Sequence, residues 1–483
     1  MDSETFRAHA HAFVDWMADY LANIERRPVR AQVQPGDISR LLAAEPPVDG
    51  EAIADIFAAF ERDILPGVTH WQHPRFFAYF PANASPPSVL AEMLTAILGV
   101  NCMAWETSPA GTELETRVLA WLRQMVGLPE GFEGVIQDSA SSATLVALLA
   151  ACERATAGAA GARGLAANRA LTVYASAETH SSIDKGMMVA GLGLENLRKI
   201  PTDSKFALRP EVLADAVRRD RDAGLLPACV VATLGTTAVG GIDPLADIAE
   251  IARREGLYLH VDAAWAGSAL VCEEFRDMLA GISEVDSFVF NPHKWLLTNF
   301  DCSAHFVRDM EEVERALTVS PAYLRTAAGD RVVDYRNRSV PLGRRFRALK
   351  LWFVIRHYGV AGLQAHVRRH VGLAQGLEAR IRNTPGFVLA APRSLSLVTF
   401  RYRPDDAANA DALDQVNREL LARVNEGGLA YLSPCEIQGR FALRLAIGAP
   451  GTQERHVIEV WNHITRLAAQ CNSAVPSPGP AGT

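Results

Sequence analysis

Several features that would assign a protein class at once are missing from this 483-residue sequence. It has no stretch of about 18 consecutive apolar residues, which argues against a helix that spans a membrane. It has no prominent run of Lys and Arg, and its net charge is −7. Binding to nucleic acid or to an anionic membrane surface is therefore not expected. The opening residues, MDSETFRAHAHAFVDW, lack the basic and apolar regions of a secretory signal.

Cysteine is also sparse, and its distribution bears on the cellular compartment. The seven cysteines are odd in number, scattered, and free of the CxxC spacing typical of zinc and redox motifs. This pattern predicts reduced thiols and a cytoplasmic protein rather than a disulfide framework. A metal site on the HWQH motif, His70 and His73, lacks further convergent ligands, so we expect no metal.

Composition and periodicity divide the chain into four parts. Residues 1–85 contain two helical stretches with too little apolar surface for a core, which predicts packing on the rest of the chain or on a second subunit. Residues 86–350 alternate helical and strand patterns and form the expected large domain. Residues 351–470 predict a smaller α+β domain, and the Pro- and Gly-rich residues 471–483 predict a disordered tail.

Short, β-rich apolar runs in the large domain predict an α/β fold with a mostly parallel sheet. Between two of these runs, IDPLADIAEIARREG is typical of a helix with Asp243 as its N-cap and Gly256 at its end. We expect residues 158–168, GAAGARGLAAN, to form a flexible connection. The predicted strands are VIQ, LTVYAS, CVVATL, LYLHVD and SFVFN.

Polar and reactive residues follow four of the predicted strands. Ligands of open parallel sheets bind at the carboxyl ends of the strands. The segments that begin there are DSASSAT, AETHSS, AAWAG and PHKW. We therefore expect one crevice lined by Ser139, Ser141, His180, Asp262, His293 and Lys294.

Taken singly, each of these features also has a structural explanation. DSASSAT could be an ordinary helix cap, Asp262 and Lys294 could form a salt bridge, and His180 could be a hydrogen-bonded core residue. Taken together they match pyridoxal phosphate. That cofactor requires a lysine for its Schiff base, an acid at its pyridinium nitrogen and a helix N-terminus for its phosphate.

Longer motifs extend this match over nearly the whole chain. They are THWQHPRFFAYFPA (69–82), SPAGTELE (108–115), SASSATLVALLAA (139–151), VATLGTT (231–237), LHVDAAWAGSA (259–269), NPHKWLLTNFDCSA (291–304) and PLGRRFRALKLWFVIRHYG (341–359). With these motifs the sequence resembles the group II pyridoxal-phosphate-dependent decarboxylases, and among them the aromatic-L-amino-acid decarboxylases. The resemblance implies fold type I, with a mostly parallel seven-stranded-type sheet, and a homodimer whose N-terminal helical segments intertwine.

The resemblance also implies roles for individual residues. Lys294 would form the Schiff base, Asp262 would bind the pyridinium nitrogen, and His180 would stack on the ring. Tyr323, in SPAYLRTA, would be the mobile-loop tyrosine that protonates the product carbon. The other implied cofactor-binding residues are Ala264 on the opposite ring face, Thr233 near the 3-hydroxyl, and Ser139, Ala140, Ser141, Asn291 and His293 at the phosphate.

The family positions around the substrate side chain form an apolar and roomy lining, which suits an aromatic ring. They are Trp71, Phe80, Ala82, Met103 and Gly343. Three departures from the family stand out: Ala82 replaces a threonine of the animal enzymes, Trp265 a tyrosine, and Asp138 a glycine. Loss of the threonine hydroxyl favours tryptophan or phenylalanine over catechol substrates, although backbone or water could replace its hydrogen bond.

The implied activity is that of a carboxy-lyase, which converts aromatic L-amino acids to arylalkylamines and CO2. The presence of Tyr323 favours the amine, because related aldehyde synthases typically carry phenylalanine there. One alternative is an aminotransferase that clamps the substrate carboxylate with Arg444 in FALRLAIG, and a structural arginine is the simpler explanation of that residue. A second is a binding protein that has lost catalysis, which the intact residue set argues against.

Overall fold

The computed structural model describes residues 1–319, 332–404 and 410–472 of the chain. Contacts between Cα atoms separate two compact units. The first unit comprises residues 1–81, 375–390 and 399–483, and the second comprises residues 82–374 and 391–398. In the part that the structure describes, no helix is long and apolar enough to cross a membrane.

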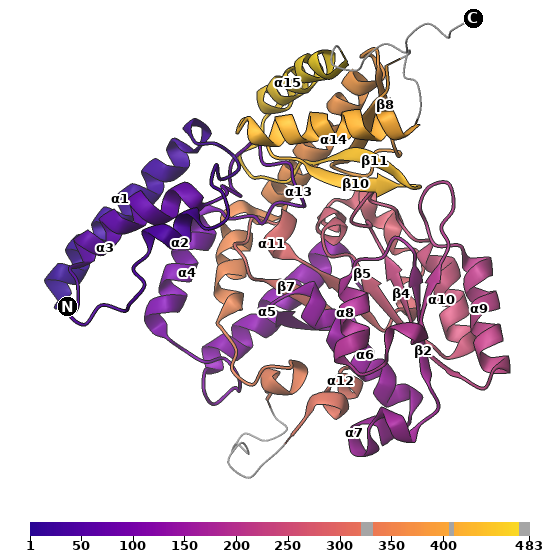
Figure 1. Ribbon diagram of the computed structural model, residues 1–483. Helices are drawn as coiled ribbons and strands as arrows, with labels where there is room; N and C mark the ends of the chain where they lie inside the picture. Colours follow the sequence, from indigo (N-terminus) through magenta and orange to yellow (C-terminus); the bar gives the residue numbers. More distant parts are fainter. Residues whose placement is uncertain (320–331, 405–409, 473–483) are drawn as a thin grey trace, which may run out of the picture. The chain divides into compact units, whose positions relative to one another are not determined.

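The second unit is built on a mostly parallel sheet that has seven strands within the described residues. Its order is β1-β7-β6-β5-β4-β2-β3, and β7 runs antiparallel to both of its neighbours. The predicted parallel α/β sheet is confirmed (Figure 1). Its strands are β1 (Glu133–Gln137), β2 (Leu171–Ser176), β3 (Leu197–Ile200), β4 (Leu226–Thr233), β5 (Tyr258–Asp262), β6 (Ser287–Phe290) and β7 (Ser303–Val307).

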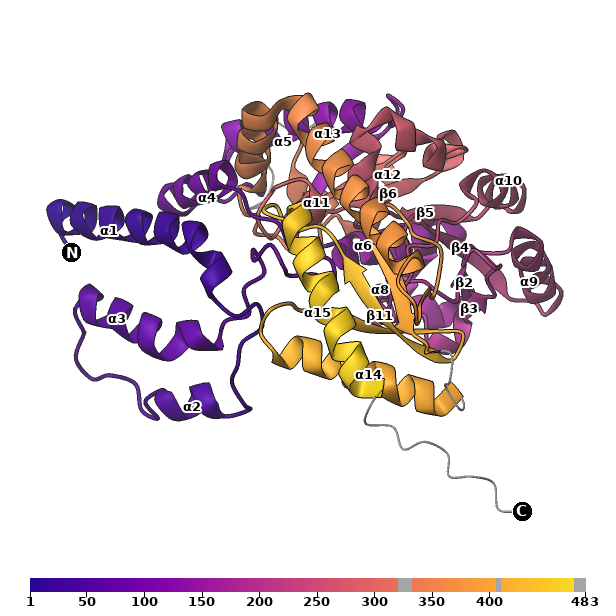
Figure 2. The same cartoon turned by 90° about the horizontal axis from the view of Figure 1, so that it is seen from above.

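Helices cover both faces of this sheet. Helix α6 packs across several strands, and α9 and α10 lie on the opposite side (Figures 1 and 2). Small buried residues such as Ala147, Ala150 and Ala151 let α6 approach the strands closely. The helices are α4 (Pro86–Leu98), α5 (Pro109–Val126), α6 (Ala140–Ala155), α7 (Ala159–Arg163), α8 (Ser182–Val189), α9 (Pro210–Asp222), α10 (Leu245–Glu255), α11 (Pro292–Trp295) and α12 (Met310–Leu317).

The first unit contains the N-terminal helices and a second sheet. None of α1, α2 and α3 has a buried residue; α1 and α3 contact each other through aromatic pairs such as Phe13 and Phe57, whose ring centroids are 4.7 Å apart. The second sheet has the order β10-β11-β9-β8 among the described strands. The elements are α1 (Ser3–Ala22), α2 (Asp37–Leu41), α3 (Ile53–Ala59), β8 (Phe387–Leu389), β9 (Leu397–Tyr402), α14 (Ala410–Glu426), β10 (Ser433–Ile437), β11 (Arg440–Ala446) and α15 (Glu454–Asn472). Helix α13 (Arg347–Arg382) belongs to both units and is interrupted at Gly359.

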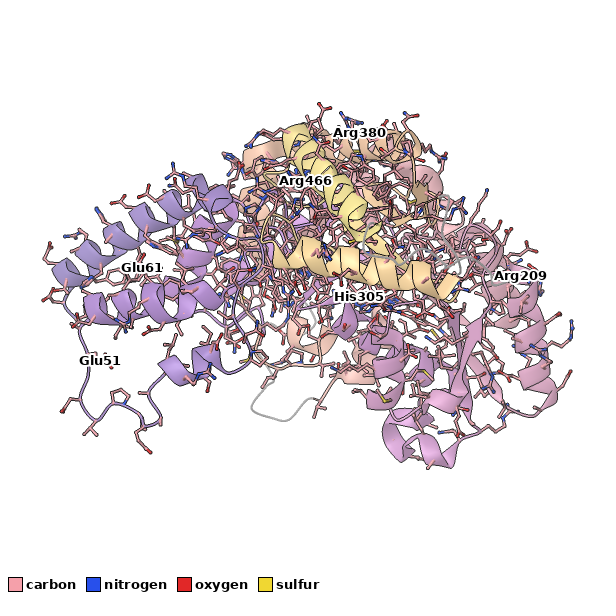
Figure 3. All side chains as sticks on the ribbon, turned by 45° about the horizontal axis from the view of Figure 1, so that its top comes forward. Glu51, Glu61, Arg209, His305, Arg380 and Arg466 are labelled. Carbon is pink, nitrogen blue, oxygen red and sulfur yellow. The ribbon has the colours of Figure 1, made fainter. Side chains whose placement is uncertain are left out.

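One local prediction is wrong. Asp243 does not cap α10, because Pro244 is the N-cap and the Asp243 carboxylate is used elsewhere. The segment 158–168, predicted as a flexible connection, contains the short helix α7. Helix α2 lies between the two longer N-terminal helices. Strands β3, β7 and β10 were not predicted at all. The side chain of His305 on β7 is fully buried in the second unit, among packed side chains (Figure 3). In the same view, Glu51 of the first unit projects outward.

Candidate active site

Four neighbouring strands bring the predicted catalytic residues to one edge of the sheet. Asp262 ends β5 and pairs in register with Thr233 at the end of β4. Lys294 lies on α11, directly after β6, which is the other neighbour of β5. His180 follows β2, which is the other neighbour of β4, and β2, β4, β5 and β6 are parallel. The carboxyl ends of these strands meet at one edge of the sheet, so His180, Asp262 and Lys294 belong to one region.

Asp262 is a buried carboxylate with unused hydrogen-bonding capacity. Its Oδ1 accepts a hydrogen bond from the Ala264 N–H, at 3.0 Å. Among the residues that the structure describes, its side chain accepts no other hydrogen bond and forms no ion pair. The alternative of a structural Asp262–Lys294 salt bridge is therefore unsupported. A buried carboxylate needs a polar partner, and a protonated ring nitrogen is one that fits this site.

His180 is held as a neutral ring beside this carboxylate. Its Nδ1 accepts a hydrogen bond from the Ser182 N–H at 3.1 Å and lies 2.9 Å from the Ser182 hydroxyl. Burial lowers the pKa of His180, Asp262 partly opposes this effect, and Lys294 adds to it. The ring is nevertheless exposed in this chain. An accessible neutral imidazole suits stacking on a flat aromatic ligand.

The start of α6 provides hydrogen-bond donors for a phosphate. Ser139 is its N-cap, and the Ser139 hydroxyl accepts a hydrogen bond from the Ser142 N–H at 3.2 Å. The N–H groups of the first turn, which includes Ala140 and Ser141, point out of such a helix end and favour an anion. Ala140 packs with Val289 of β6 and with Ala264, so this helix end lies beside the other site residues.

Asn291 and His293 are oriented by the first residues of β7. The Ser303 hydroxyl donates to Asn291 Oδ1 at 2.6 Å, and the Cys302 N–H donates to His293 Nδ1 at 2.9 Å. Burial lowers the pKa of His293 to about 3, so the neutral ring carries its hydrogen on Nε2. The Asn291 amide and this Nε2–H could both donate to a phosphate.

Hydrogen bonds connect the segment that carries Lys294 to the segment that contains Ala82. The Asn83 N–H donates to the His293 carbonyl at 2.7 Å, and the Leu297 N–H donates to Asn83 Oδ1 at 3.1 Å. The Ser85 hydroxyl donates to the Leu297 carbonyl at 2.6 Å. These bonds place Ala82, a predicted substrate residue, beside the segment that carries Lys294.

Arg344 connects the segments that carry Met103 and Gly343, and a buried ion pair to α5 holds it in place. The Arg344 guanidinium contacts the Glu115 carboxylate at 2.6 Å, and both side chains are 2% exposed. The Cys102 N–H donates to the Arg344 carbonyl at 2.9 Å, which ties the two segments together. Among the described residues, a Cβ added at Gly343 would meet only Asn101 Nδ2, at 3.7 Å, so these residues leave open space at this position.

Three predicted site residues are not brought to this place by the second unit. Tyr323 lies outside the described residues. Trp71 and Phe80 belong to the first unit, where the Trp71 ring stacks on Phe76 at 4.5 Å between centroids and Phe80 is buried. Gly448 is required beside Phe80, because a Cβ there would approach the Phe80 ring to 2.8 Å. That Trp71, Phe80 and Tyr323 lie near a substrate stays a prediction.

The alternative roles, a carboxylate clamp at Arg444 and a metal site at His70 and His73, gain no support. Arg444 is buried on β11 and donates to the Tyr79 carbonyl, and burial lowers its pKa to about 10. His70 pairs with the Tyr20 hydroxyl at 2.7 Å, and His73 Nδ1 accepts from the Arg75 N–H at 3.0 Å. In the described part of the chain, no group of three or more potential metal ligands is present.

Asp243 is a site residue that sequence reasoning misassigned. Its Oδ2 accepts the Thr233 N–H and its Oδ1 accepts the Leu208 N–H, each at 2.7 Å. Burial raises its pKa to about 6. Asp243 therefore holds the end of β4, where Thr233 lies. The Asp-Pro pair before a helix predicted a cap, and no local pattern distinguishes a cap from this long-range contact.

A family model of the pyridoxal-dependent decarboxylase conserved domain matches residues 35–403. The chain belongs to the pyridoxal-dependent decarboxylase family. Its length and sequence agree with curated family members. Phenylacetaldehyde synthase of Arabidopsis thaliana is 44% identical, over 97% of this chain and 97% of its own. Aromatic-L-amino-acid decarboxylase of Sus scrofa is 44% identical, over 98% of each chain.

Solved structures in this family share the fold. A crystal structure of Oryza sativa TDC with PLP and tryptamine has a TM-score of 0.94 and 38% identity, over 97% of this chain and 99% of that chain. The predicted family and fold class are thereby confirmed. As a pyridoxal-dependent decarboxylase, the chain is a carboxy-lyase whose cofactor is pyridoxal phosphate. The Asp262 oxygen that accepts no hydrogen bond from a described residue and the donors around α6 fit that cofactor.

Proposed function

We propose that this decarboxylase converts aromatic L-amino acids to the corresponding arylalkylamines and CO2. The observation that carries the proposal is the joint placement of His180, Asp262 and Lys294, in a chain 44% identical to an aromatic-L-amino-acid decarboxylase. Tryptophan, phenylalanine, tyrosine, DOPA and 5-hydroxytryptophan are the candidate substrates.

When bound, pyridoxal phosphate would supply an electron sink for decarboxylation at Cα. Lys294 would attach the cofactor. Asp262 would hold a proton on the ring nitrogen through a buried, charge-assisted hydrogen bond, which would contribute about 1.5–3 kcal/mol. His180 would stack on the ring, and Thr233, which Asp243 holds, would lie near the 3-hydroxyl. The phosphate would be bound by Ser139, Ala140, Ser141, Asn291 and His293.

The proposed substrate pocket is apolar, which favours an aromatic side chain over an acidic one. Ala82, Met103 and Gly343 carry no charge, and neither do Trp71 and Phe80, the other two substrate residues that the family resemblance implies. A pocket without cationic groups penalises a carboxylate side chain, because the charge would lose its hydration without compensation. The open space at Gly343 favours an indole. Ala82 offers no hydroxyl to a ring, which favours tryptophan and phenylalanine.

Tyr323 decides between amine and aldehyde in this proposal. A phenol in contact with the substrate can donate its proton to Cα after decarboxylation, which yields the amine. The similarity to phenylacetaldehyde synthase makes the distinction important. We propose the amine, because Tyr323 supplies the acidic hydroxyl that a phenylalanine lacks.

We also propose that the enzyme is a cytoplasmic homodimer. Helix α4 carries an apolar stripe at helical spacing in which every side chain is between 40% and 69% exposed: Leu90, Met93, Leu94, Ile97 and Leu98. A contiguous exposed apolar stripe of this kind is typical of a protein–protein interface. The seven cysteines are all free, which supports a reducing compartment.

Product analysis of purified enzyme with a panel of aromatic amino acids tests this function. We expect equimolar amine and CO2 from at least one of them, with no amino transfer to a keto acid. The Lys294→Ala variant should lose both turnover and the visible absorbance of lysine-bound cofactor. A variant that keeps the absorbance and the activity refutes the role of Lys294, and keto-acid-dependent transfer refutes decarboxylation.

A further inference from the structure

Trp295 is the neighbour of Lys294, and its side chain is completely buried. Its indole Nε1–H donates a hydrogen bond to Nδ1 of His370, at 3.0 Å. The two rings are nearly parallel, with an angle of 13° and centroids 6.3 Å apart. The contact joins α11 to α13, which lie close together in both ribbon views (Figures 1 and 2). The indole is therefore directed by a specific acceptor in addition to being packed.

A second indole extends this contact to the other strand ends. The centroid of Trp265, which follows Ala264, lies 5.8 Å from that of Trp295. The Trp265 Nε1–H donates to the Gly235 carbonyl at 2.7 Å, two residues after Thr233. The two tryptophans thus connect the segments that follow β4, β5 and β6. Each of those segments carries a proposed cofactor-binding residue.

His370 stands on a fixed part of α13. Gln364 Nε2 donates to the Val271 carbonyl at 2.8 Å, and Arg368 pairs with Glu274 at 2.6 Å. Both partners lie in the segment that follows β5. A shift of this part of α13 would therefore break contacts to the segment that follows the strand ending in Asp262.

The protonation state of His370 suits a hydrogen-bond acceptor for the Trp295 N–H. Because Nδ1 accepts the indole N–H, the neutral ring carries its hydrogen on Nε2. The groups that face it are His366, whose ring centroid lies 4.3 Å away, and Arg369 on the same helix, with Trp295 from α11. Burial lowers the pKa of His370 well below its ordinary value, and His366 and Arg369 add to this effect. Protonation, which would remove the acceptor, is thus opposed.

We infer that the Trp295–His370 hydrogen bond is a positioning contact for Lys294. Trp295 and Lys294 share the single turn of α11, so fixing the indole fixes the backbone from which the amine projects. A displacement of about 1 Å at a reacting group can slow a reaction about a hundredfold. The inference deepens the proposed function and rests on it, because it takes Lys294 as the cofactor lysine.

The test uses substitutions that separate the hydrogen bond from packing. Trp295→Phe keeps an aromatic ring and removes the donor, and His370→Leu removes the acceptor. We expect each to lower kcat of the holoenzyme about tenfold, with KM within about twofold of wild type. The visible absorbance and circular dichroism of bound cofactor should shift as the lysine reorients. His370→Asn, which offers an oxygen near the Nδ1 position, should restore both readouts.

Two further measurements complete the test. The double variant Trp295→Phe/His370→Leu should be no slower than either single variant, because both remove the same bond. In the cofactor-free protein, His370→Leu should alter the near-ultraviolet circular dichroism of tryptophan, and His370→Asn should restore it. Trp461→Phe is the matched control: it removes another buried indole donor, which bonds Thr384 at 3.3 Å, and should leave the cofactor spectrum unchanged.

Wild-type kcat and spectra in Trp295→Phe would overturn the inference, and so would additive losses in the double variant or failure of His370→Asn to restore function. If His370→Leu does not fold, Trp295→Phe and His370→Asn decide alone. Failure of the proposed function is distinguishable, because amino transfer to a keto acid would then replace CO2 release in the wild-type enzyme. Failure of the proposed role of Lys294 would show as cofactor absorbance retained in Lys294→Ala. If Trp295→Phe behaves like the wild type while Lys294→Ala is inactive, only the positioning role of Trp295 is refuted.

Discussion

Replacing Glu115 by alanine should destabilise the enzyme severely, because this carboxylate is the buried counter-ion of Arg344. Both of its oxygens accept from the guanidinium, at 3.0 and 2.6 Å, and one also accepts the Ile136 N–H at 2.9 Å. Each side chain of the pair is only 2% exposed. The variant would leave a cation and an amide N–H buried without their partner. Breaking such a pair costs about 3–5 kcal/mol of unfolding free energy.

Asp215→Ala provides the matched control. Asp215 pairs with Arg218 at 2.7 Å, but the two side chains are 55% and 68% exposed. An exposed pair contributes about 0.2–1 kcal/mol. Urea unfolding of both holoenzyme variants, followed by far-ultraviolet circular dichroism, should therefore separate them by at least about 2 kcal/mol. A Glu115→Ala variant as stable as Asp215→Ala would refute the reasoning.

The same variant should also affect substrate binding. The Arg344 N–H donates to Asn101 Oδ1 at 2.9 Å, and its carbonyl accepts the Cys102 N–H at 2.9 Å. Loss of the ion pair would loosen the segments that carry Met103 and Gly343, so KM should rise. The double variant Glu115→Leu/Arg344→Met should recover most of the stability, because it removes the stranded charge. A double variant no more stable than Glu115→Ala contradicts this account.

Three further outcomes are expected. Tyr323→Phe should divert product in air from amine to aldehyde, ammonia and hydrogen peroxide, with O2 as the oxidant. An unchanged amine yield removes Tyr323 from the mechanism. Gly343→Ser should fold normally, because the added Cβ would make an ordinary 3.7 Å contact with Asn101. It should lower activity on tryptophan relative to tyrosine. Equal losses on both substrates refute the role of Gly343 in selecting for ring size. His305→Leu should flatten the acid side of the stability profile. Burial lowers the pKa of His305 to about 3, so from about pH 6.5 downward the unfolded chain binds a proton that the folded chain refuses, and stability falls by up to about 1.4 kcal/mol per pH unit until pH 3. Urea midpoints at several pH values measure this slope. If His305→Leu has the same slope as the wild type, His305 does not contribute to it.

The parts of the fold predicted correctly are those with a local signal. LTVYAS coincides with β2, and SFVFN contains β6. Buried parallel strands are continuous apolar runs, so their carboxyl ends can be located from sequence, and Asp262 and Lys294 with them. Strand β7 (SAHFV) was missed because a histidine interrupts its apolar run. That histidine, His305, has neither ring nitrogen hydrogen-bonded to a described residue.

Long-range pairs had no such signal. Glu115 and Arg344 are 229 positions apart, and Trp295 and His370 are 75 apart. Each residue alone resembles an ordinary helix residue, and only the folded chain reveals its partner. The family resemblance predicted which residues contact the cofactor and the substrate. The side chains that hold those residues in place, such as Asp243, required the structure.

The reversed direction of β7 has a consequence for how the site is assembled. Because β7 is antiparallel to β6, it begins at the edge where β6 ends, and Ser303 and the preceding Cys302 bond Asn291 and His293 directly. Lys294 and these two hydrogen bonds are thus contained in one local β6–β7 unit, from Ser287 to Val307, of low contact order. The supports from Asn83 and His370 come from distant parts of the sequence. Asp262 reaches the same edge only through a parallel crossover. Low contact order favours early formation of the local contacts on the lysine side, before the long-range contacts form.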